Sequence, residues 1–452
     1  MFGNKSRHTR QLQAAKTLLQ ALGEQLDSHV SVRLWDGSMI PLGSNVDPDL
    51  FVSISGPGVV GSLLRRPTAG NLLRQYALGH VDFHGTDLHS FLQKMHVDSS
   101  RKRAKKISKS VLFKSLLPFL FEPASSSVVN HEYQGDISGR NRKKGENNDF
   151  IQFHYDVSNE FYELFLDKEM VYTCAYFTDW NNSLEQAQHD KLDMICRKLR
   201  LQRGERLLDI GFGWGSLLCH AAQHYGVTAH GITLAENQVT YTREKIQRLG
   251  LQDRVSVEIC DYQNFEGKFD KVASIGMYEH VGIDNLSGYM KKVNTYLPKN
   301  GLFLLQGITR PGKSTMKKFR HQNAERRILN KYIFPGGELD HVGHMVQCME
   351  SNGFEVSDIE GWRSHYMQTC KLWSQRLYER REEAISFVGE EKYRVWLLYL
   401  TGCSLAFQNG GARLYQVLME KQAKREASCL PLTRADLYQD RSVAEARRPY
   451  AA

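Results

Sequence analysis

A glycine-rich turn, Gly211-Phe212-Gly213-Trp214-Gly215, is the part of the chain best suited to hold a cofactor. It follows the apolar run Arg206 to Ile210, which favours a buried parallel strand, and precedes Ser216 to Tyr225, which has a helix-like composition. Such a turn lets a ligand approach the backbone closely, because glycine has no Cβ. One glycine motif is a weak indication by itself, so its surroundings must decide what it binds.

The spacing of the glycines and the acid before them distinguish this turn from a nicotinamide site. The pattern is GxGxG, not GxGxxG, and Asp209 precedes the first glycine. In methyltransferases this spacing leaves the backbone open for the amino-acid part of S-adenosylmethionine. We therefore expect Asp209, Gly211 and Gly213 to bind that cofactor.

Two later positions should complete the cofactor site. No acid follows the second expected strand, so Thr233, Leu234 and Gln238 are candidates for the ribose side, with Thr233 and Gln238 able to bind its hydroxyls. Asp261 and Tyr262 follow the third expected strand, where the adenine amino group would be met. Turn chemistry or helix capping would explain any one of these residues, but explains the ordered set poorly.

Strand-like and helix-like segments alternate on both sides of these residues. Strands are expected at 206–210, 227–232, 255–259, 269–275 and 302–306, with helices at 216–225, 236–249 and 284–297. This alternation implies a parallel, doubly wound sheet. The expected fold class is α/β, with a mostly parallel Rossmann-like methyltransferase sheet and a smaller N-terminal α+β accessory domain.

Further blocks give the chain a specific family resemblance. Met170 to Phe177 and Gly276 to Gly282, together with the glycine turn, resemble cyclopropane-fatty-acyl-phospholipid synthases and their mycolic-acid relatives. Blocks at 304–309, 330–337 and 399–403 extend the resemblance over essentially all of 149–424. Leu34 to Gly37 and Gly79 to Gly85 resemble, less sharply, the accessory domain of that family. In the first block, Tyr172 and Thr173 are assigned to the cofactor site.

The resemblance implies methyl transfer from S-adenosylmethionine to a cis double bond in a phospholipid acyl chain. Loss of a proton from the new methyl group then closes a cyclopropane ring. A carboxylate base risks alkylation beside a carbocation, and the family uses a bound bicarbonate instead. Its cage maps to the backbones of Cys174 and Ile308, and to Glu279 and Tyr366. Glu279 would take up the bicarbonate proton, and Tyr366 would donate a hydrogen bond.

Two positions leave alternatives open. Gln306 stands where the family usually has His, and glutamine cannot take up a proton near neutral pH. Methyl transfer could therefore end in a branched or otherwise modified chain, or serve another small molecule. Cys403 matches a family cysteine discussed as catalytic, but a buried thiol packed on a helix fits equally well. His280 is interpreted as structural, because neighbours on a helix point apart.

Composition and charge suggest how the chain is divided and what it meets. We expect an accessory, lipid-binding-like domain with a basic helix at 10–120, a flexible linker at 121–148, the methyltransferase domain at 149–424 and a polar tail at 425–452. The basic residues of 101–114 run into an apolar segment, which suits either a membrane-surface helix or a solvated linker helix. The net charge of +9 suits anionic lipid headgroups, and the resemblance argues against nucleic acid. A homodimer is possible.

The remaining sequence features point to a cytoplasmic protein at the inner face of the membrane. No run of eighteen apolar residues exists, and the first residues lack the apolar core of a secretory signal. The eight cysteines include no CxxC pair, so neither a zinc ribbon nor a disulfide framework is expected. No metal site is expected: His80, His84 and His89 are interpreted as exposed strand or loop residues.

Overall fold

A computed structural model describes residues 2–94, 113–115, 117–119, 157–320, 332–333, 337–423, 426–428 and 430–439. The chain divides into two compact units. Unit 1 comprises Met1–Ile137, His321–Ile333 and Lys371–Leu405, and unit 2 comprises Ser138–Arg320, Phe334–Cys370 and Ala406–Ala452. The expected linker at 121–148 and most of the basic stretch at 101–114 lie outside the described residues.

A seven-stranded sheet forms the centre of unit 2, in the order β10-β11-β9-β8-β5-β6-β7. Its strands are β5 (Arg206–Ile210), β6 (Thr228–Thr233), β7 (Val255–Ile259), β8 (Lys271–Ile275), β9 (Leu302–Thr309), β10 (Phe354–Gly361) and β11 (Arg413–Lys421). The five strands from β5 to β9 pair in parallel. The expected α/β class with a mostly parallel, doubly wound sheet is confirmed.

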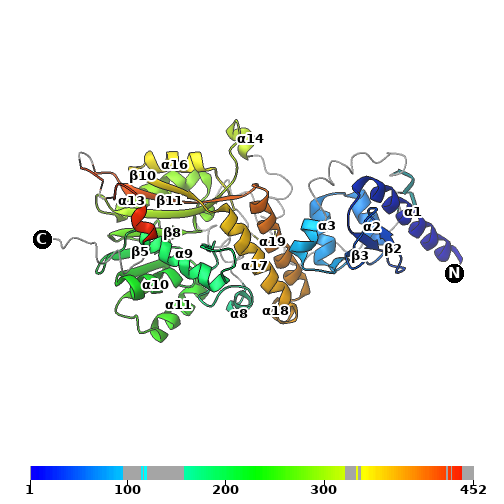
Figure 1. Cartoon of the computed structure of the whole chain (residues 1–452), viewed down its shortest axis with the longest axis horizontal. Coiled ribbons are helices and arrows are strands. Elements are labelled where there is room, and N and C mark those ends of the chain that lie inside the picture. Colours follow the sequence, from blue (N-terminus) through cyan, green and yellow to red (C-terminus); the bar gives the residue numbers. More distant parts are fainter. Residues whose placement is uncertain are drawn as a thin grey trace. The chain divides into compact units, whose positions relative to one another are not determined.

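Helices cover both faces of this sheet (Figure 1). Apolar residues of α9 (Leu184–Lys198), α10 (Ser216–Tyr225) and α11 (Glu236–Arg248) pack on one face. Apolar residues of α12 (Tyr278–Val281), α13 (Leu286–Tyr296) and α16 (Val342–Glu350) pack on the other. Because β5 and β8 are central strands covered on both sides, Leu207 and Leu208 are both fully buried although they point to opposite faces.

The strands β10 and β11 were not expected from the sequence. β11 pairs antiparallel with both β9 and β10, so it runs opposite to the other strands of the sheet. β10 lies at the edge and alternates buried or half-buried with exposed residues. The other described helices after residue 157, which belong to either unit, are α8 (Asn159–Glu163), η2 (Ile283–Asn285), α14 (Met316–Arg320), α17 (Arg363–Glu379), α18 (Arg381–Val388), α19 (Glu390–Gln408) and η3 (Ala435–Tyr438).

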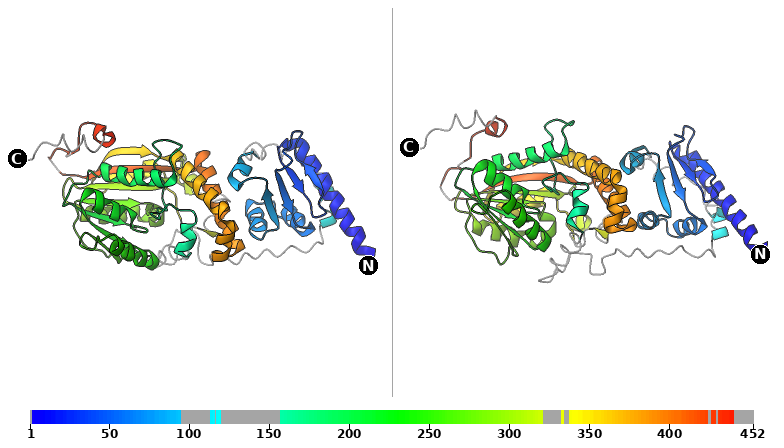
Figure 2. Two further views of the ribbon diagram at one scale, coloured as in Figure 1. Left: turned by 60° about the horizontal axis from the view of Figure 1, so that its bottom comes forward. Right: turned by 90° about the horizontal axis from the view of Figure 1, so that it is seen from below.

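Unit 1 contains a four-stranded sheet in the order β2-β1-β3-β4 (Figure 2). Its elements are α1 (Phe2–Leu26), β1 (Ser31–Arg33), β2 (Met39–Pro41), β3 (Phe51–Ile54), α2 (Pro57–Arg65), α3 (Ala69–Ala77), β4 (Val81–His84), α4 (Leu88–Lys94) and η1 (Leu117–Phe119). The expected α+β character is confirmed. α2 begins at Pro57, because the fixed φ of proline suits the first position of a helix.

Residues of α18 and α19 group with the N-terminal sheet, which differs from the expected division of the chain. Arg394 Nη2 donates to Asp82 Oδ2 over 2.9 Å. The His89 ring Nε2 contacts Ser404 Oγ at 3.0 Å. His89 lies on α4 and is fully buried, so its expected exposure was wrong. The assignment of the N-terminal segment as an accessory, lipid-binding domain stays a prediction.

None of the described helices combines the length and the apolar character needed to cross a membrane.

Candidate functional site

A cavity lies at the carboxyl ends of β5, β6, β7 and β8, where parallel α/β sheets bind ligands. The glycine turn after β5 and the residues that follow β6 and β7 form much of its wall. All ten residues expected to bind the cofactor line this cavity: Tyr172, Thr173, Asp209, Gly211, Gly213, Thr233, Leu234, Gln238, Asp261 and Tyr262. The structure thus brings together residues that are up to 90 positions apart in the sequence.

The glycine turn needs glycine for its backbone shape and for space. Gly211, Gly213 and Gly215 have φ values of 81°, 58° and 77°, a region that other residues rarely adopt. A Cβ on Gly211 would lie 3.0 Å from Met277, and one on Gly215 would clash with Thr242. The turn therefore keeps its backbone open toward the cavity and starts α10 directly behind it.

Asp209, the last-but-one residue of β5, is a buried carboxyl group with unused hydrogen-bonding capacity. Its side chain is 3% exposed, and its Oδ1 has no hydrogen-bond partner. Burial raises the pKa of Asp209 to about 7, and the nearby Lys191 ammonium opposes this shift. A buried, unpaired acceptor at a cavity wall is suited to a cationic or hydrogen-bond-donating ligand group.

Lys191 on α9 is a cavity residue that the sequence analysis missed. It is 2% exposed, and its Nζ donates to Thr173 Oγ1 over 3.0 Å. Burial lowers the pKa of Lys191 to about 8, while Asp167 and Asp209 are among the groups that oppose this shift. The available signal was its position: Lys191 stands one turn from Ala187 and from Ile195 on the buried face of the helix.

The ribose-side residues contact one another in the cavity wall. Thr233 Oγ1 donates to Gln238 Oε1 over 3.2 Å. Asp261 Oδ1 accepts the backbone N–H of Gln263 over 2.9 Å, which fixes the carboxylate in a turn after β7. The hydroxyl, amide and carboxylate groups offer both donors and acceptors at this side of the cavity.

Glu279 on α12 is a second buried carboxyl group. Its Oε1 accepts the backbone N–H of Ile308 over 2.6 Å, whereas its Oε2 has no hydrogen-bond partner. Burial raises the pKa of Glu279 to about 7, and the Ile308 hydrogen bond opposes this shift. The adjacent His280 lines the cofactor cavity and Glu279 does not, so the two side chains point apart as expected. Because His280 can contact a ligand in the cavity, a purely structural interpretation of it is incomplete.

Tyr366 and Cys174 lie within electrostatic range of each other. Burial raises the pKa of the Tyr366 phenol well above its usual value, and Cys370, Cys174 and Glu279 would raise it further when ionised. Cys174 is fully buried, and its Sγ donates to the Ala175 carbonyl over 3.2 Å. Of the four expected cage residues, Glu279 and Ile308 are joined by a hydrogen bond, and Tyr366 lies near enough to Cys174 and Glu279 for their charges to act on its pKa.

Gln306 is engaged in a chain of buried polar contacts. Its Oε1 accepts the amide of Gln416 over 2.9 Å, and Gln416 Oε1 accepts Lys198 Nζ over 2.7 Å. Lys198 in turn forms an ion pair with Glu360 on β10. Gln306 and Gln416 are directly paired across β9 and β11, and neither is among the residues that line the cofactor cavity.

Cys403 lies on α19, in the part of that helix that belongs to unit 1. Burial raises the pKa of its thiol to about 12, and a hydrogen bond involving Tyr399 opposes this shift. A thiol with such a pKa is almost entirely protonated near neutral pH. Cys403 is half-buried, and both interpretations drawn from the sequence stay predictions.

Comparisons with known proteins were made against families, curated proteins and solved structures. A family model described as mycolic acid cyclopropane synthetase matches residues 142–417, which is more than half of the chain. A probable fatty acid methyltransferase of Pseudomonas putida is 34% identical over 417 residues, covering 92% of this chain and 98% of that protein. Cyclopropane mycolic acid synthase 1 of Mycobacterium tuberculosis is 32% identical and covers 60% of this chain and 96% of its own length.

Two solved structures resemble the catalytic part of the chain. A cyclopropane synthase from Mycobacterium tuberculosis has a TM-score of 0.58 at 32% identity, covering 61% of this chain and 98% of that one. A mycolic acid cyclopropane synthase complexed with SAH and CTAB has a TM-score of 0.57 at 31% identity, covering 62% of this chain and 99% of that one. These similarities confirm the family resemblance drawn from the sequence blocks.

Proposed function

Since the chain belongs to the mycolic acid cyclopropane synthetase family of S-adenosylmethionine-dependent methyltransferases, we propose that it methylates a cis double bond in a phospholipid acyl chain. The observation that carries this proposal is that two buried carboxyl groups each have one oxygen without a hydrogen-bond partner. Asp209 Oδ1 has no hydrogen-bond partner at the wall of the cofactor cavity. Glu279 Oε2 has none either, and Glu279 directly precedes His280, which lines the cavity.

The residues that line the cavity fit S-adenosylmethionine in their chemistry. When bound, this cofactor supplies an electrophilic methyl group. Asp209 would hold the ammonium of its amino-acid part, and Gly211 and Gly213 would let that part approach the backbone. Thr233 and Gln238 would hold the ribose hydroxyls, and Asp261 would accept from the adenine amino group. The positive charge of Lys191 would favour the ionised form of Asp209.

We propose further that bicarbonate binds beside Glu279, where it would supply a base that escapes alkylation. The unpaired, buried Oε2 of Glu279 supports this fit, because it can accept a hydrogen bond from the bicarbonate O–H, and the raised pKa lets it take up that proton near pH 7. The Tyr366 phenol would donate a second hydrogen bond, since its raised pKa keeps it protonated. The backbones of Cys174 and Ile308 would complete the cage.

Cyclopropane ring closure is the proposed outcome, and Gln306 supports one alternative. The Gln306 carboxamide oxygen already accepts a hydrogen bond from the Gln416 amide, and the side chain cannot accept a proton near neutral pH. Proton removal would then depend on Glu279 and bicarbonate alone. If that step is slow, the cation formed by the same methyl transfer loses a proton from a neighbouring chain carbon instead, which leaves a branched or otherwise modified chain. The printed name of the Pseudomonas putida relative, a probable fatty acid methyltransferase, is compatible with either product.

We also propose that the protein works on the anionic surface of a membrane. The net charge of +9 supports this, because basic proteins are attracted to anionic headgroups. Vesicles that contain anionic phospholipid should sediment the protein, and raising the salt from about 0.05 M to about 0.5 M should release it, because salt screens such attraction. Equal binding to neutral and anionic vesicles would contradict this part of the proposal.

The function is tested by expressing the chain in a bacterial host that makes unsaturated phospholipids but no cyclopropane lipids. Mass spectrometry of the acyl chains should show gain of one methylene unit, and chromatography against standards separates a ring from a branch. Asp209→Asn serves as the control that should lose cofactor binding and product together. An unchanged acyl profile, with folded protein present, would overturn the proposal.

A further inference from the structure

We propose that His189, His220 and His224 form a transition-metal site, suited to Zn²⁺, that joins α9 to α10. One ring nitrogen of each histidine lies within 4.8 Å of the corresponding nitrogens of the other two. Within the described residues, no other group of three or more metal-ligating side chains is gathered so closely. The site lies outside the cofactor cavity, since none of the three histidines lines it.

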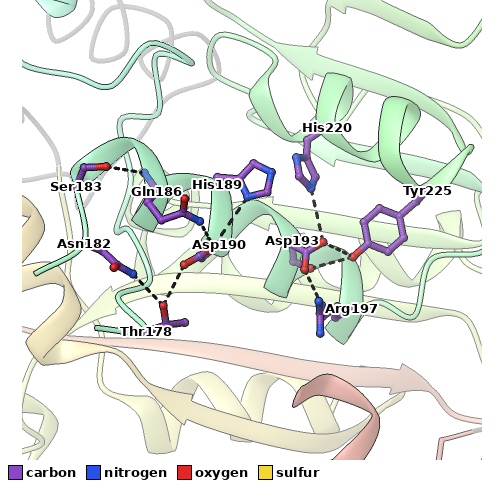
Figure 3. A network of polar contacts seen from close by, with 10 residues as sticks. All are labelled: Thr178, Asn182, Ser183, Gln186, His189, Asp190, Asp193, Arg197, His220 and Tyr225. Carbon is purple, nitrogen blue, oxygen red and sulfur yellow. Dashed lines mark hydrogen bonds and ion pairs between the residues drawn. The ribbon is translucent and has the colours of Figure 1, made fainter. Parts of the chain in front are cut away.

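The helix geometry explains why the three rings converge. His220 and His224 are four residues apart on α10, so they occupy one face of that helix, one turn from each other. Their ring centroids are 4.5 Å apart. α9 packs along α10 and brings the His189 ring to 5.1 Å from that of His220. Figure 3 shows these two side chains facing each other from their separate helices.

His220 is the least hydrated of the three and has unused capacity for a ligand. Its side chain is 6% exposed, and its Nε2 has no hydrogen-bond partner. The Asp193 Oδ1 atom is 3.9 Å from this nitrogen, which is longer than a hydrogen bond. A buried polar atom without a partner costs free energy unless a water, an ion or a ligand completes its contacts.

Two carboxylates lie beside the imidazoles, Asp190 at His189 and Asp193 at His220. Asp193 accepts Tyr225 Oη over 2.7 Å and Arg197 Nε over 2.6 Å, which hold it beside His220. Asp190 lies 3.9 Å from His189 Nδ1 and accepts Gln186 Nε2 over 2.7 Å. Figure 3 shows both carboxylates within this network. A carboxylate at the ring nitrogen that does not bind the ion orients a metal-binding histidine, and Asp190 takes this place beside Nδ1 of His189. Asp193 instead faces the unpartnered Nε2 of His220.

The donor set determines the kind of ion. Three imidazole nitrogens favour Zn²⁺, Cu²⁺ or Ni²⁺ over Mg²⁺ or Ca²⁺, which prefer oxygen. His189 and His224 are exposed, so an ion would keep at least one position for water, as in three-histidine zinc sites.

An ion at this position would connect to the cofactor cavity through two helices. Lys191 and Leu192 of α9 and Ser216 and Leu217 of α10 line that cavity. An ion held by both helices would fix the spacing of these walls and stabilise the folded state, because it binds only when the helices are packed. The inference does not depend on which acyl chain the enzyme methylates.

The test uses the full-length protein without an affinity tag, freed of metal by a chelator and then titrated with Zn²⁺ in a calorimeter. We expect one Zn²⁺ per chain and a rise in the thermal unfolding midpoint on its addition. His189→Ala and His224→Ala should each weaken Zn²⁺ binding by roughly tenfold or more and reduce that rise. Both side chains are exposed, so the variants should fold.

His8→Ala is the matched control, because His8 is exposed on α1 and belongs to no histidine cluster in the described residues. It should bind Zn²⁺ like the unaltered protein. Absence of saturable Zn²⁺ binding would overturn the proposal. So would Zn²⁺ binding that His189→Ala and His224→Ala leave unchanged, since the ion would then bind elsewhere. Cobalt substitution provides an independent check: a tetrahedral site with three imidazoles should give visible absorption that both variants lose.

Discussion

Glu279 Oε1 lies 2.6 Å from the backbone nitrogen of Ile308, while Glu279 Oε2 is buried without a hydrogen-bond partner. The contact joins the short helix α12, which follows β8, to the end of the neighbouring strand β9. One oxygen is thereby fixed and the other is left for a ligand. Such half-satisfied groups are rare in folded proteins and are concentrated at sites of function.

Replacing this carboxyl group should separate chemistry from cofactor binding. Glu279→Gln keeps an acceptor for Ile308 but cannot donate or take up a proton, so product formation should fall by about 10²-fold or more. Calorimetry should show SAH binding within a few-fold of the unaltered protein, because Glu279 does not line the cofactor cavity. Glu205→Gln is the control, since that half-buried carboxylate pairs with Lys271 away from the cavity. Loss of SAH binding in Glu279→Gln would show that the residue has been assigned the wrong role.

The same residue should make stability depend on pH. Its folded-state pKa, about 7, lies above the ordinary value of 4.5, so the folded protein binds more protons than the unfolded chain between these values. The stabilisation is complete below pH 4.5 and is lost as the pH rises through 7. Removing the charge by Glu279→Gln should therefore be more favourable at pH 8 than at pH 5, by at most about 3 kcal/mol in unfolding free energy. Urea unfolding at both pH values measures this, and an equal effect at both would contradict it.

Lys191 should control the charge of Asp209 and through it cofactor affinity. Lys191→Met removes the positive charge that opposes the raised pKa of Asp209, so Asp209 should be mostly protonated at pH 7. We expect SAH to bind roughly tenfold or more weakly at pH 7, with partial recovery near pH 9 as Asp209 ionises. Lys299→Met, which alters an exposed ion pair with Glu426, is the control. Unchanged SAH affinity at pH 7 in Lys191→Met would rule out this role.

The buried chain through Gln306 should contribute to stability. Gln306→Leu removes the acceptor of the Gln416 amide inside the sheet, and leaving a buried donor unpaired costs about 1–3 kcal/mol. Urea unfolding should show this loss, whereas Gln247→Leu, at an exposed position of α11, should change stability by less than about 0.5 kcal/mol. A Gln306→Leu protein as stable as the parent would mean that Gln416 finds another acceptor.

The parallel half of the sheet could be predicted from the sequence because β5 and β8 are buried on both faces, whereas the edge strand β7 begins by alternating buried and exposed residues. Arg206–Ile210 and Val255–Ile259 were predicted to the residue, since each apolar run is bounded by turn residues. Most of the cavity followed from this, because ligand-binding residues lie at the carboxyl ends of such strands. β10 was missed because its alternation includes three acidic side chains on an edge strand, and β11 because it follows a long helix.

Residues that reach the site from outside these turns could not be found in the same way. Lys191 lies on α9, which precedes β5, the first strand of the central sheet in chain order. Only the packing of α9 on that sheet brings its ammonium to the cavity. The histidine cluster has the same origin, since His189 and His220 are 31 positions apart and meet through helix packing. Likewise, the contact between Gln306 and Gln416 depends on the antiparallel register of β9 and β11.

The most direct test of the central claim follows the transferred methyl group itself. Purified protein would be incubated with S-adenosylmethionine carrying a CD₃ methyl group, with bicarbonate and with vesicles of a cis-unsaturated phospholipid, and the acyl chains analysed by mass spectrometry. We predict an acyl chain that gains one carbon and retains two of the three deuterium atoms, with the chromatographic behaviour of a cyclopropane. Retention of all three would indicate a branched product without ring closure. No deuterium in any acyl chain, with SAH binding intact, would contradict the account.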